Sequence, residues 1–155
     1  MIYHFKSENM EKLNSIIFYN IDKAIRSYRN YAQHQLKAHG YTITIDQWLI
    51  IKAILENPGI TQNEIGDLVF KDNASVTRMI DLMVKSEYII RKVHPEDRRK
   101  TQLEVTDSGV KVIKEVQNIV EKNRKTALKG ISNEELEVMY LALLKISENC
   151  LNPKK

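Results

Sequence analysis

Apolar side chains recur every three or four residues toward both ends of the chain, a spacing that places them on one face of a helix. Near the N-terminus this pattern predicts a helix over residues 10–39, which Gly40 ends. Toward the C-terminus it predicts a helix over residues 106–129 and, after Gly130, a last helix over residues 132–150. Both ends of the chain are therefore expected to form long amphipathic helices.

Three pairs of residues mark the starts of helices. In each pair a Thr or Ser is followed three residues later by Gln or Glu, so that each side chain can bond a backbone N–H that the helix leaves free. The pairs are Thr44 with Gln47, Thr61 with Glu64, and Ser132 with Glu135. The helix that begins at Thr44 is apolar nearly all round and is expected to be central, and Pro58 with Gly59 ends it.

A further helix is expected over residues 73–86, with Asp72 or Asn73 as its cap. Its apolar face is formed by Val76, Met79, Ile80 and Met83. The rest of its surface carries Ser75, Thr77, Arg78, Asp81 and Lys85. The apolar side is expected to hold this helix against the core, while its polar side faces outward and its first backbone N–H groups favour a phosphate.

Two strand-like segments follow, residues 88–94 and 100–105. In the second, Thr101, Leu103 and Val105 alternate with polar residues, as in a half-buried strand. The connection between the segments contains no Gly, so it is not a tight two-residue turn and should project. Helix, helix, tight turn, helix and hairpin is the order of a winged helix-turn-helix. The expected fold class is therefore mainly α with a small β-hairpin wing.

The positive charge of the chain is concentrated in this hairpin. The net charge is +4 and the pI about 9.1, which is only mildly basic. Residues 91–100 contain five Lys or Arg and two Asp or Glu, a net charge of +3. Such clustering is typical of a surface that binds phosphate. We therefore expect residues 73–86 to enter the major groove of DNA and the loop 94–100 to enter the minor groove.

Ten residues are expected at this DNA interface, from the polar side of the helix and from the hairpin loop. They are Asn73, Ser75, Thr77, Arg78, Lys85, His94, Asp97, Arg98, Arg99 and Lys100. In the alternative interpretation, the helix has an ordinary solvated face, and Asp97 with Arg99 forms a surface ion pair that contributes little to stability. The combination of this helix with a cationic hairpin favours the DNA interface.

Two adjoining segments carry a family resemblance. NASVTRMIDLMVKSEYIIR and RKVHPEDRRKTQLEVTDSG, residues 73–91 and 91–109, resemble the recognition helix and wing of the MarR family of bacterial transcriptional regulators, and the resemblance covers nearly the whole chain. It implies a homodimer that binds a pseudo-palindromic operator, with repression as the expected effect; whether binding represses or activates depends on promoter position, which the chain does not encode. By position, Arg99 would insert into the minor groove and Asp97 would orient it. Gly66 departs from the alanine that is commoner in the supporting helix, and it permits closer helix packing.

The expected organisation has three regions: residues 1–43 and 106–155 for dimerisation, and residues 44–105 for DNA binding. The resemblance implies that the first and last helices form the dimer layer. Independently, the terminal helices carry more apolar surface than the middle region needs, and burial against a partner is its simplest use. A larger monomeric bundle is the alternative.

The resemblance also implies a small-molecule effector, since many members respond to phenolic or other ligands in a cleft between the dimer helices and the DNA-binding lobe. Residues that could border such a cleft are Tyr28, Tyr31, His34, Trp48 and Lys52. The plainer interpretation, in which Tyr28, Tyr31 and Trp48 only pack the interior, is favoured, and the sequence specifies no ligand.

The sequence offers little support for other classes of function. His4, His34, His39 and His94 form no metal signature, no cofactor motif is present, and no nucleophile elbow, HExxH motif or phosphate-binding glycine loop indicates an enzyme. A winged helix that binds only protein is the alternative function, although protein interfaces are depleted of lysine in their cores. Operator sequence and regulated genes cannot be read from the chain.

The cellular compartment is expected to be the cytoplasm. The chain has no apolar segment of about 20 residues that could span a membrane, and its first residues lack the apolar core of a signal peptide. Its single cysteine, Cys150, excludes an intramolecular disulfide and fits a reducing compartment. We interpret Cys150 as an interface or surface residue.

Overall fold

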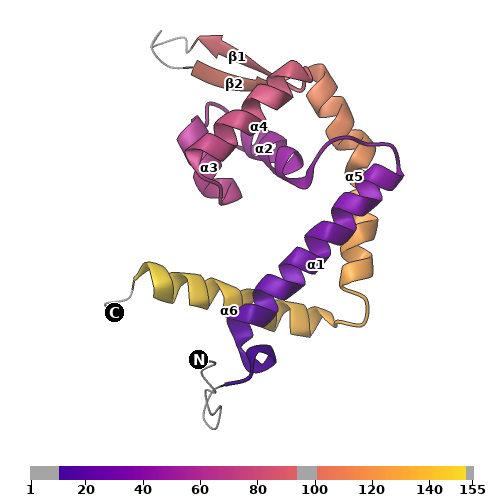
Figure 1. The fold of residues 1–155 in the computed structure, drawn as a ribbon, viewed down its shortest axis with the longest axis vertical. Coiled ribbons are helices and arrows are strands. Elements are labelled where there is room, and N and C mark those ends of the chain that lie inside the picture. The colour runs from indigo at the N-terminus through magenta and orange to yellow at the C-terminus, as the bar shows by residue number, and fades with distance from the viewer. Residues whose placement is uncertain (1–10, 94–100, 153–155) are drawn as a thin grey trace, which may run out of the picture. The chain divides into compact units, whose positions relative to one another are not determined.

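The computed structural model describes residues 11–93 and 101–152, and its helices and strands follow the expected order (Figure 1). The elements are η1 (Leu13–Ser15), α1 (Ile17–Ala38), α2 (Ile45–Glu56), α3 (Gln62–Val69), α4 (Asn73–Lys85), β1 (Ile89–Val93), β2 (Thr101–Val105), α5 (Asp107–Ala127) and α6 (Asn133–Leu151). The chain forms two compact units, Met1–Asn123 and Arg124–Lys155. The mainly helical fold class with a β-hairpin is confirmed.

All three expected capping pairs are present at helix starts. Oγ1 of Thr44 accepts the Gln47 N–H at 3.2 Å, and the side chain of Gln47 accepts the Thr44 N–H at 2.9 Å. Thr61 with Glu64 and Ser132 with Glu135 repeat the same reciprocal arrangement. A cap of this kind contributes about 1 kcal/mol, so these residues fix where α2, α3 and α6 begin.

The first long helix begins later than expected. The sequence predicts a helix from residue 10, but α1 begins at Ile17 and is preceded by the short 3-10 helix η1. Ile16 between them is extended, with no side chain capping α1, and the Ser15 hydroxyl bonds the Lys12 carbonyl at 2.6 Å. Apolar spacing continues through this segment, but the local side-chain bond favours a turn over helix.

The core of the first unit surrounds α2, as its apolar sequence predicts. Ile50, Ile51, Ala53 and Ile54 of α2 are buried, whereas Leu55 is 43% exposed. Each element from α1 through α5, except β2, contributes at least one of the largest fully buried side chains. They are Leu36, Ile43, Ile50, Ile51, Ile65, Ile80, Met83, Ile89, Val76 and Val116. One continuous core therefore supports α3, α4 and the hairpin, which lie together in Figure 1.

The hairpin is a two-stranded antiparallel sheet in which Ile89 pairs with Val105 and Val93 pairs with Thr101. Ile89 and Leu103 are buried in the core, so the sheet is anchored by one face near the helices. α5 follows with Val112, Ile113 and Val116 buried. The buried positions of α5 end at Asn123, and the rest of the helix, through Ala127, is exposed.

The second unit contains the end of α5 and α6. α6 has no buried residue, and only Leu136 and Ile146 are partly covered. Over residues 11–93 and 101–152, no helix combines the length and the apolar character needed to cross a membrane. The division into regions 1–43, 44–105 and 106–155 stays a prediction about function.

Candidate nucleic-acid interface

α4 presents two unlike faces, as its sequence predicts. Val76, Ile80 and Met83 are buried, and Met79 packs partly against the core. Of the residues expected to face DNA, Ser75 is half-buried, and the exposed ones are Asn73, Thr77, Arg78 and Lys85. The core therefore fixes α4 from one side and leaves a polar strip along the other.

The start of α4 is capped by Asp72, which settles the choice between Asp72 and Asn73. The Asp72 carboxylate accepts the backbone N–H of Ser75 at 2.9 Å and the Ser75 hydroxyl at 2.8 Å. These hydrogen bonds, the backbone one first, hold the pKa of the Asp72 carboxyl below its usual range. A negative charge therefore stands at the N-terminus of α4 at neutral pH, where it also complements the helix dipole.

This cap changes the chemistry expected at the helix start. The sequence predicts backbone N–H groups there that attract a phosphate, but the Ser75 N–H already binds a carboxylate. The Ser75 hydroxyl has likewise given its only proton to Asp72. Ser75 can therefore accept a hydrogen bond from a partner, but it cannot donate one while the cap is intact.

Thr77 is held by a residue that the sequence analysis missed. Nε2 of Gln62, the first residue of α3, donates to the Thr77 hydroxyl at 2.5 Å, and that hydroxyl donates to the Asn73 carbonyl at 2.8 Å. Gln62 is half-buried and lies fifteen residues before Thr77, so no local spacing connects them. The only available signal was that a helix-turn-helix brings the start of one helix beside the next.

The turn between α3 and α4 is tight. The Lys71 N–H bonds the Gly66 carbonyl at 3.0 Å, and a Cβ atom on Gly66 would lie 3.0 Å from the Lys71 carbonyl oxygen. Gly66 therefore permits the close approach expected from the sequence. Phe70 makes the turn with φ 55°, in the left-handed region, and its side chain is 92% exposed. A bulky residue is unusual in that conformation.

Two positive side chains of the hairpin form ion pairs within the protein. Arg91 on β1 pairs with Asp81 on α4 at 2.5 Å, and Lys92 pairs with Glu104 on β2 at 2.5 Å. Two of the five cations in residues 91–100 are thus partly neutralised. The loop residues expected to contact DNA, which are His94, Asp97, Arg98, Arg99 and Lys100, lie outside the described residues. The Arg91–Asp81 pair joins the hairpin directly to α4.

The hairpin is also joined to α5. The Thr106 hydroxyl donates to the Glu87 carbonyl, and it accepts the Gly109 N–H at 3.1 Å as the cap of α5. The Thr106 N–H bonds the Tyr88 carbonyl at 3.0 Å. Glu87 has φ 59°, again in the left-handed region. Thr106 therefore connects the entry of β1, the exit of β2 and the start of α5.

A shared carboxylate links α1, α2 and the α3–α4 turn. Asp46, in the first turn of α2, pairs with Arg29 of α1 and with Lys71 of the turn, the latter at 3.4 Å. The Asp46 side chain is only 25% exposed. Its charge is therefore screened less by water than that of a surface carboxylate, and the two pairs hold α1 and the α3–α4 turn to the start of α2.

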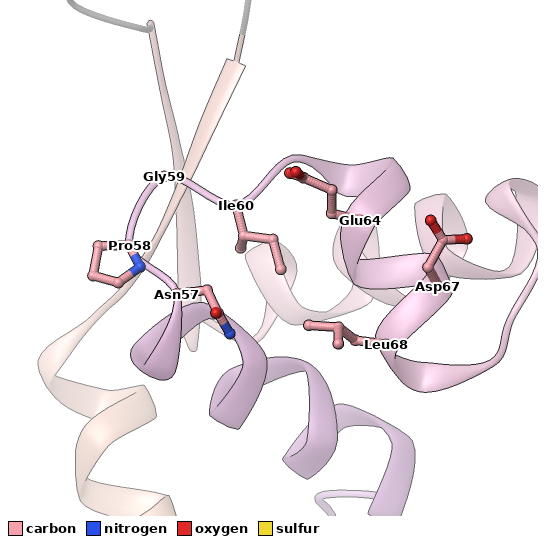
Figure 2. Close-up of a pocket in the computed structure, with 7 residues that line it drawn as sticks. All are labelled: Asn57, Pro58, Gly59, Ile60, Glu64, Asp67 and Leu68. Carbon is pink, nitrogen blue, oxygen red and sulfur yellow. The ribbon is translucent and has the colours of Figure 1, made fainter. Parts of the chain in front are cut away.

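The five residues expected near an effector lie on two helices that contact each other, α1 and α2. Trp48 packs against the core, Lys52 pairs with Glu56 at 2.8 Å, Tyr28 and Tyr31 are half-buried, and His34 is exposed. None of them lines the open pocket of about 470 Å³ in Figure 2, which lies between the α2–α3 connection and α3. That pocket is lined by Asn57, Pro58, Gly59, Ile60, Glu64, Asp67 and Leu68.

Known structures share this fold. A protein of unknown function from Listeria innocua Clip11262 is 28% identical, with 86% of this chain and 91% of that chain covered and a TM-score of 0.65. BpsR of Bordetella bronchiseptica, whose DNA binding is regulated by 6-hydroxynicotinic acid, is 16% identical, with 90% and 98% covered and a TM-score of 0.80. S. aureus MepR, solved as a DNA complex, is 21% identical, with 88% and 98% covered and a TM-score of 0.76.

The segment that contains the helix-turn-helix also matches a family by sequence. Residues 43–101, from the last residues before α2 to the first residue of β2, match the sequence model of the MarR family. The match therefore covers α2, α3, α4 and β1, which are the elements that position the polar strip of α4. This match shows a MarR-family domain in residues 43–101, within a fold that BpsR and MepR share over most of the chain.

Proposed function

We propose that the protein is a homodimeric, sequence-specific DNA-binding repressor of transcription that recognises a pseudo-palindromic operator. In this proposal α4 enters the major groove and the loop 94–100 enters the minor groove. The interface consists of Asn73, Ser75, Thr77, Arg78 and Lys85 on α4 and of His94, Asp97, Arg98, Arg99 and Lys100 in the loop. Arg99 is the residue that enters the minor groove, and Asp97 orients it.

One observation carries the proposal: α4 is fixed to the core by its apolar side and exposes Asn73, Thr77, Arg78 and Lys85 on its surface. A major groove about 12 Å wide admits one helix with such a face. The guanidinium of Arg78 is suited to a bidentate contact with guanine or to a phosphate. S. aureus MepR, which shares this fold, was solved in complex with DNA, and this supports a DNA-binding role for the fold.

The homodimer is supported by apolar side chains that the single chain leaves exposed. α1 exposes Ile17, Phe18, Tyr19 and Ile25, and α6 exposes Val138, Met139, Tyr140, Leu141, Leu143, Leu144 and Leu151. Exposed apolar surface on this scale marks an interface in a folded protein. A two-fold dimer that places its recognition helices about 34 Å apart would fit two successive turns of one face of DNA.

The test combines selection of DNA from a random pool with fluorescence anisotropy on the selected duplex at several salt concentrations. Specific binding that weakens steeply with salt is expected, because each neutralised phosphate releases counterions. Sedimentation of the free protein should give the mass of a dimer. Equal affinity for selected and random duplexes would overturn the proposal and favour a winged helix that binds only protein.

Two variants test the assigned contacts. Arg78→Ala and Arg99→Ala should each weaken binding to the selected duplex by roughly 1–3 kcal/mol, the scale of one specific contact. Arg26→Ala is the matched control, because Arg26 is an exposed arginine of α1 that pairs with Asp22 at 2.7 Å. Its affinity for DNA should be unchanged. Loss of binding in all three variants would indicate a general charge effect instead of the assigned contacts.

We also propose that a small aromatic or phenolic effector regulates DNA binding, bordered by Tyr28, Tyr31, His34, Trp48 and Lys52. The support is the structural likeness to BpsR, whose DNA binding responds to 6-hydroxynicotinic acid. A thermal-shift screen of hydroxylated aromatic acids should find a compound that raises the melting temperature and weakens operator binding. A screen in which no compound does both would remove this part of the proposal.

A further inference from the structure

The hydroxyl of Thr77 has no proton left for DNA. A threonine hydroxyl has one proton to donate and two lone pairs to accept with. At Thr77 the proton goes to the Asn73 carbonyl at 2.8 Å, and one lone pair receives the Gln62 side-chain amide at 2.5 Å. Most hydrogen-bonding atoms that bases present in the major groove are acceptors, namely N7, O6 and O4. Thr77 cannot bond any of them in this arrangement.

Gln62 fixes this arrangement from a different helix. It is the first residue of α3, directly after the capping box of Thr61 and Glu64, so its backbone is held at a defined helix start. Its side chain is half-buried between α3 and α4, which pack against each other. The hydroxyl of Thr77 is thus bonded from its own helix and from α3, and rotation about χ1 would break both bonds.

The side chain of Thr77 is nevertheless exposed, on the polar strip of α4. With the proton and one lone pair of the oxygen bonded to protein, what remains to meet a partner is the γ-methyl group and one lone pair, which can accept only from the amino groups of adenine or cytosine. A threonine methyl in the major groove is complementary to the 5-methyl group of thymine. Ser75, two residues earlier, has also given its proton to the protein, which leaves hydrogen-bond donation from α4 to Asn73, Arg78 and Lys85.

We propose that Thr77 reads DNA through its methyl group, against the 5-methyl group of one thymine in each half-site, and that Gln62 is its positioning residue. This inference rests on the proposed function, because it assigns a base preference to the helix placed in the major groove. It predicts that the operator carries a thymine at the position that faces Thr77, and that the protein distinguishes thymine from uracil there.

The experiment uses the full chain and duplexes selected by it, in which each thymine is replaced in turn by deoxyuridine. This change removes one methyl group and leaves every hydrogen-bonding atom of the base in place. Deoxyuridine at one symmetry-related pair of positions should weaken binding by about fourfold for each half-site. This is the scale expected when one methyl group is lost from an apolar contact. No effect at any thymine would overturn the inference.

Variants at Thr77 separate the methyl group from the hydroxyl. Thr77→Val loses the Gln62 bond, but valine has one strongly preferred χ1 rotamer in a helix, so its methyl groups stay in place and the thymine-to-uracil ratio should be kept, whereas Thr77→Ser should bring that ratio close to one. Both should retain the melting temperature of the parent within a few degrees, since the side chain is exposed. A ratio that survives in Thr77→Ser and disappears in Thr77→Val would show that the hydroxyl is the reading group.

The role of Gln62 has its own readout. Gln62→Met keeps the length of the side chain without the amide, so the Thr77 hydroxyl should turn more freely and the thymine-to-uracil ratio should fall at least twofold. An unchanged ratio would remove Gln62 from the inference. These outcomes differ from failure of the proposed function, in which the parent protein would select no sequence and would bind random duplexes as tightly.

Discussion

The carbonyl oxygen of Tyr88 lies 2.2 Å from the point where a Cβ atom on Gly109 would stand. The oxygen belongs to the backbone and cannot move away without disturbing the hairpin. Gly109→Ala should therefore destabilise the fold by roughly 1–3 kcal/mol, the usual cost of overpacking, although alanine has the higher helix propensity. The free energy of unfolding in urea measures the effect.

Ser108→Ala is the control for this prediction, because Ser108 is exposed in the same turn of α5. It should change the free energy of unfolding by less than about 0.5 kcal/mol. If Gly109→Ala proved as stable as the parent, the close packing of α5 on the entry to the hairpin would be wrong.

Asp46→Asn should lower stability by about 1 kcal/mol, because it removes the partner of both Arg29 and Lys71 at a carboxylate that is only 25% exposed. The loss should shrink as salt is added, since salt screens the parent pair. Asp22→Asn, which breaks the exposed pair with Arg26, is the matched control and should have less effect. Equal losses in the two variants would contradict a special role for Asp46.

Phe70→Asn should stabilise the protein by about 0.5–1 kcal/mol. Phe70 has φ 55° and is 92% exposed, so the substitution relieves an unfavourable backbone conformation and removes little packing. Asparagine tolerates the left-handed region better than other residues with a side chain. The melting temperature measures the gain. A loss of stability would mean that the Phe70 ring contributes packing that outweighs the backbone cost.

Acid should weaken the starts of α3 and α4. Hydrogen bonds from Ser75 lower the pKa of Asp72, and those from Thr61 lower the pKa of Glu64. The folded chain therefore binds protons at these carboxyls less readily than the unfolded chain does. The stability that these two carboxylates contribute is fully present above the unfolded pKa of about 4. It is lost as the pH falls through their lowered pKa in the folded chain.

Asp72→Asn tests this pH dependence, since asparagine also caps a helix but does not titrate. Urea unfolding between about pH 5 and pH 3 should show a shallower decline for the variant than for the parent. The same substitution removes a negative charge from the surface proposed to face DNA and should tighten binding at low salt. Parallel stability profiles would show that the Asp72 cap contributes nothing through its charge.

Local patterns in the sequence predicted much of the fold. Thr44, Thr61 and Ser132 fixed helix starts correctly, because a capping box acts over only four residues. The predicted start of α1 was wrong. The apolar spacing continues toward the N-terminus through Ile16, which is extended, and through Ser15, whose hydroxyl bonds the Lys12 carbonyl, so the spacing overstates the length of the helix. Periodicity reports which face is apolar, and it does not report where a helix begins.

The candidate site was harder to predict, because its chemistry depends on contacts between distant segments. The residue types on α4 were visible in the sequence, but the hydrogen bond that fixes the orientation of the Thr77 hydroxyl comes from Gln62 on another helix. The charge of the hairpin was also visible, whereas its partial neutralisation by Asp81 depends on how β1 lies beside α4. Both effects follow from tertiary packing, which no spacing along the chain encodes.

The joint at Thr106 gives the wing the mechanics of a lever. Its fixed end is the bond network that joins Glu87, Tyr88 and the start of α5, and its arm is the pair of five-residue strands. At about 3.3 Å per residue the arm is about 17 Å long, so a rotation of about 5° at the joint displaces the far ends by about 1.5 Å. A change in the direction of α5 too small to disturb the core would thus shift Val93 and Thr101 by half the length of a hydrogen bond.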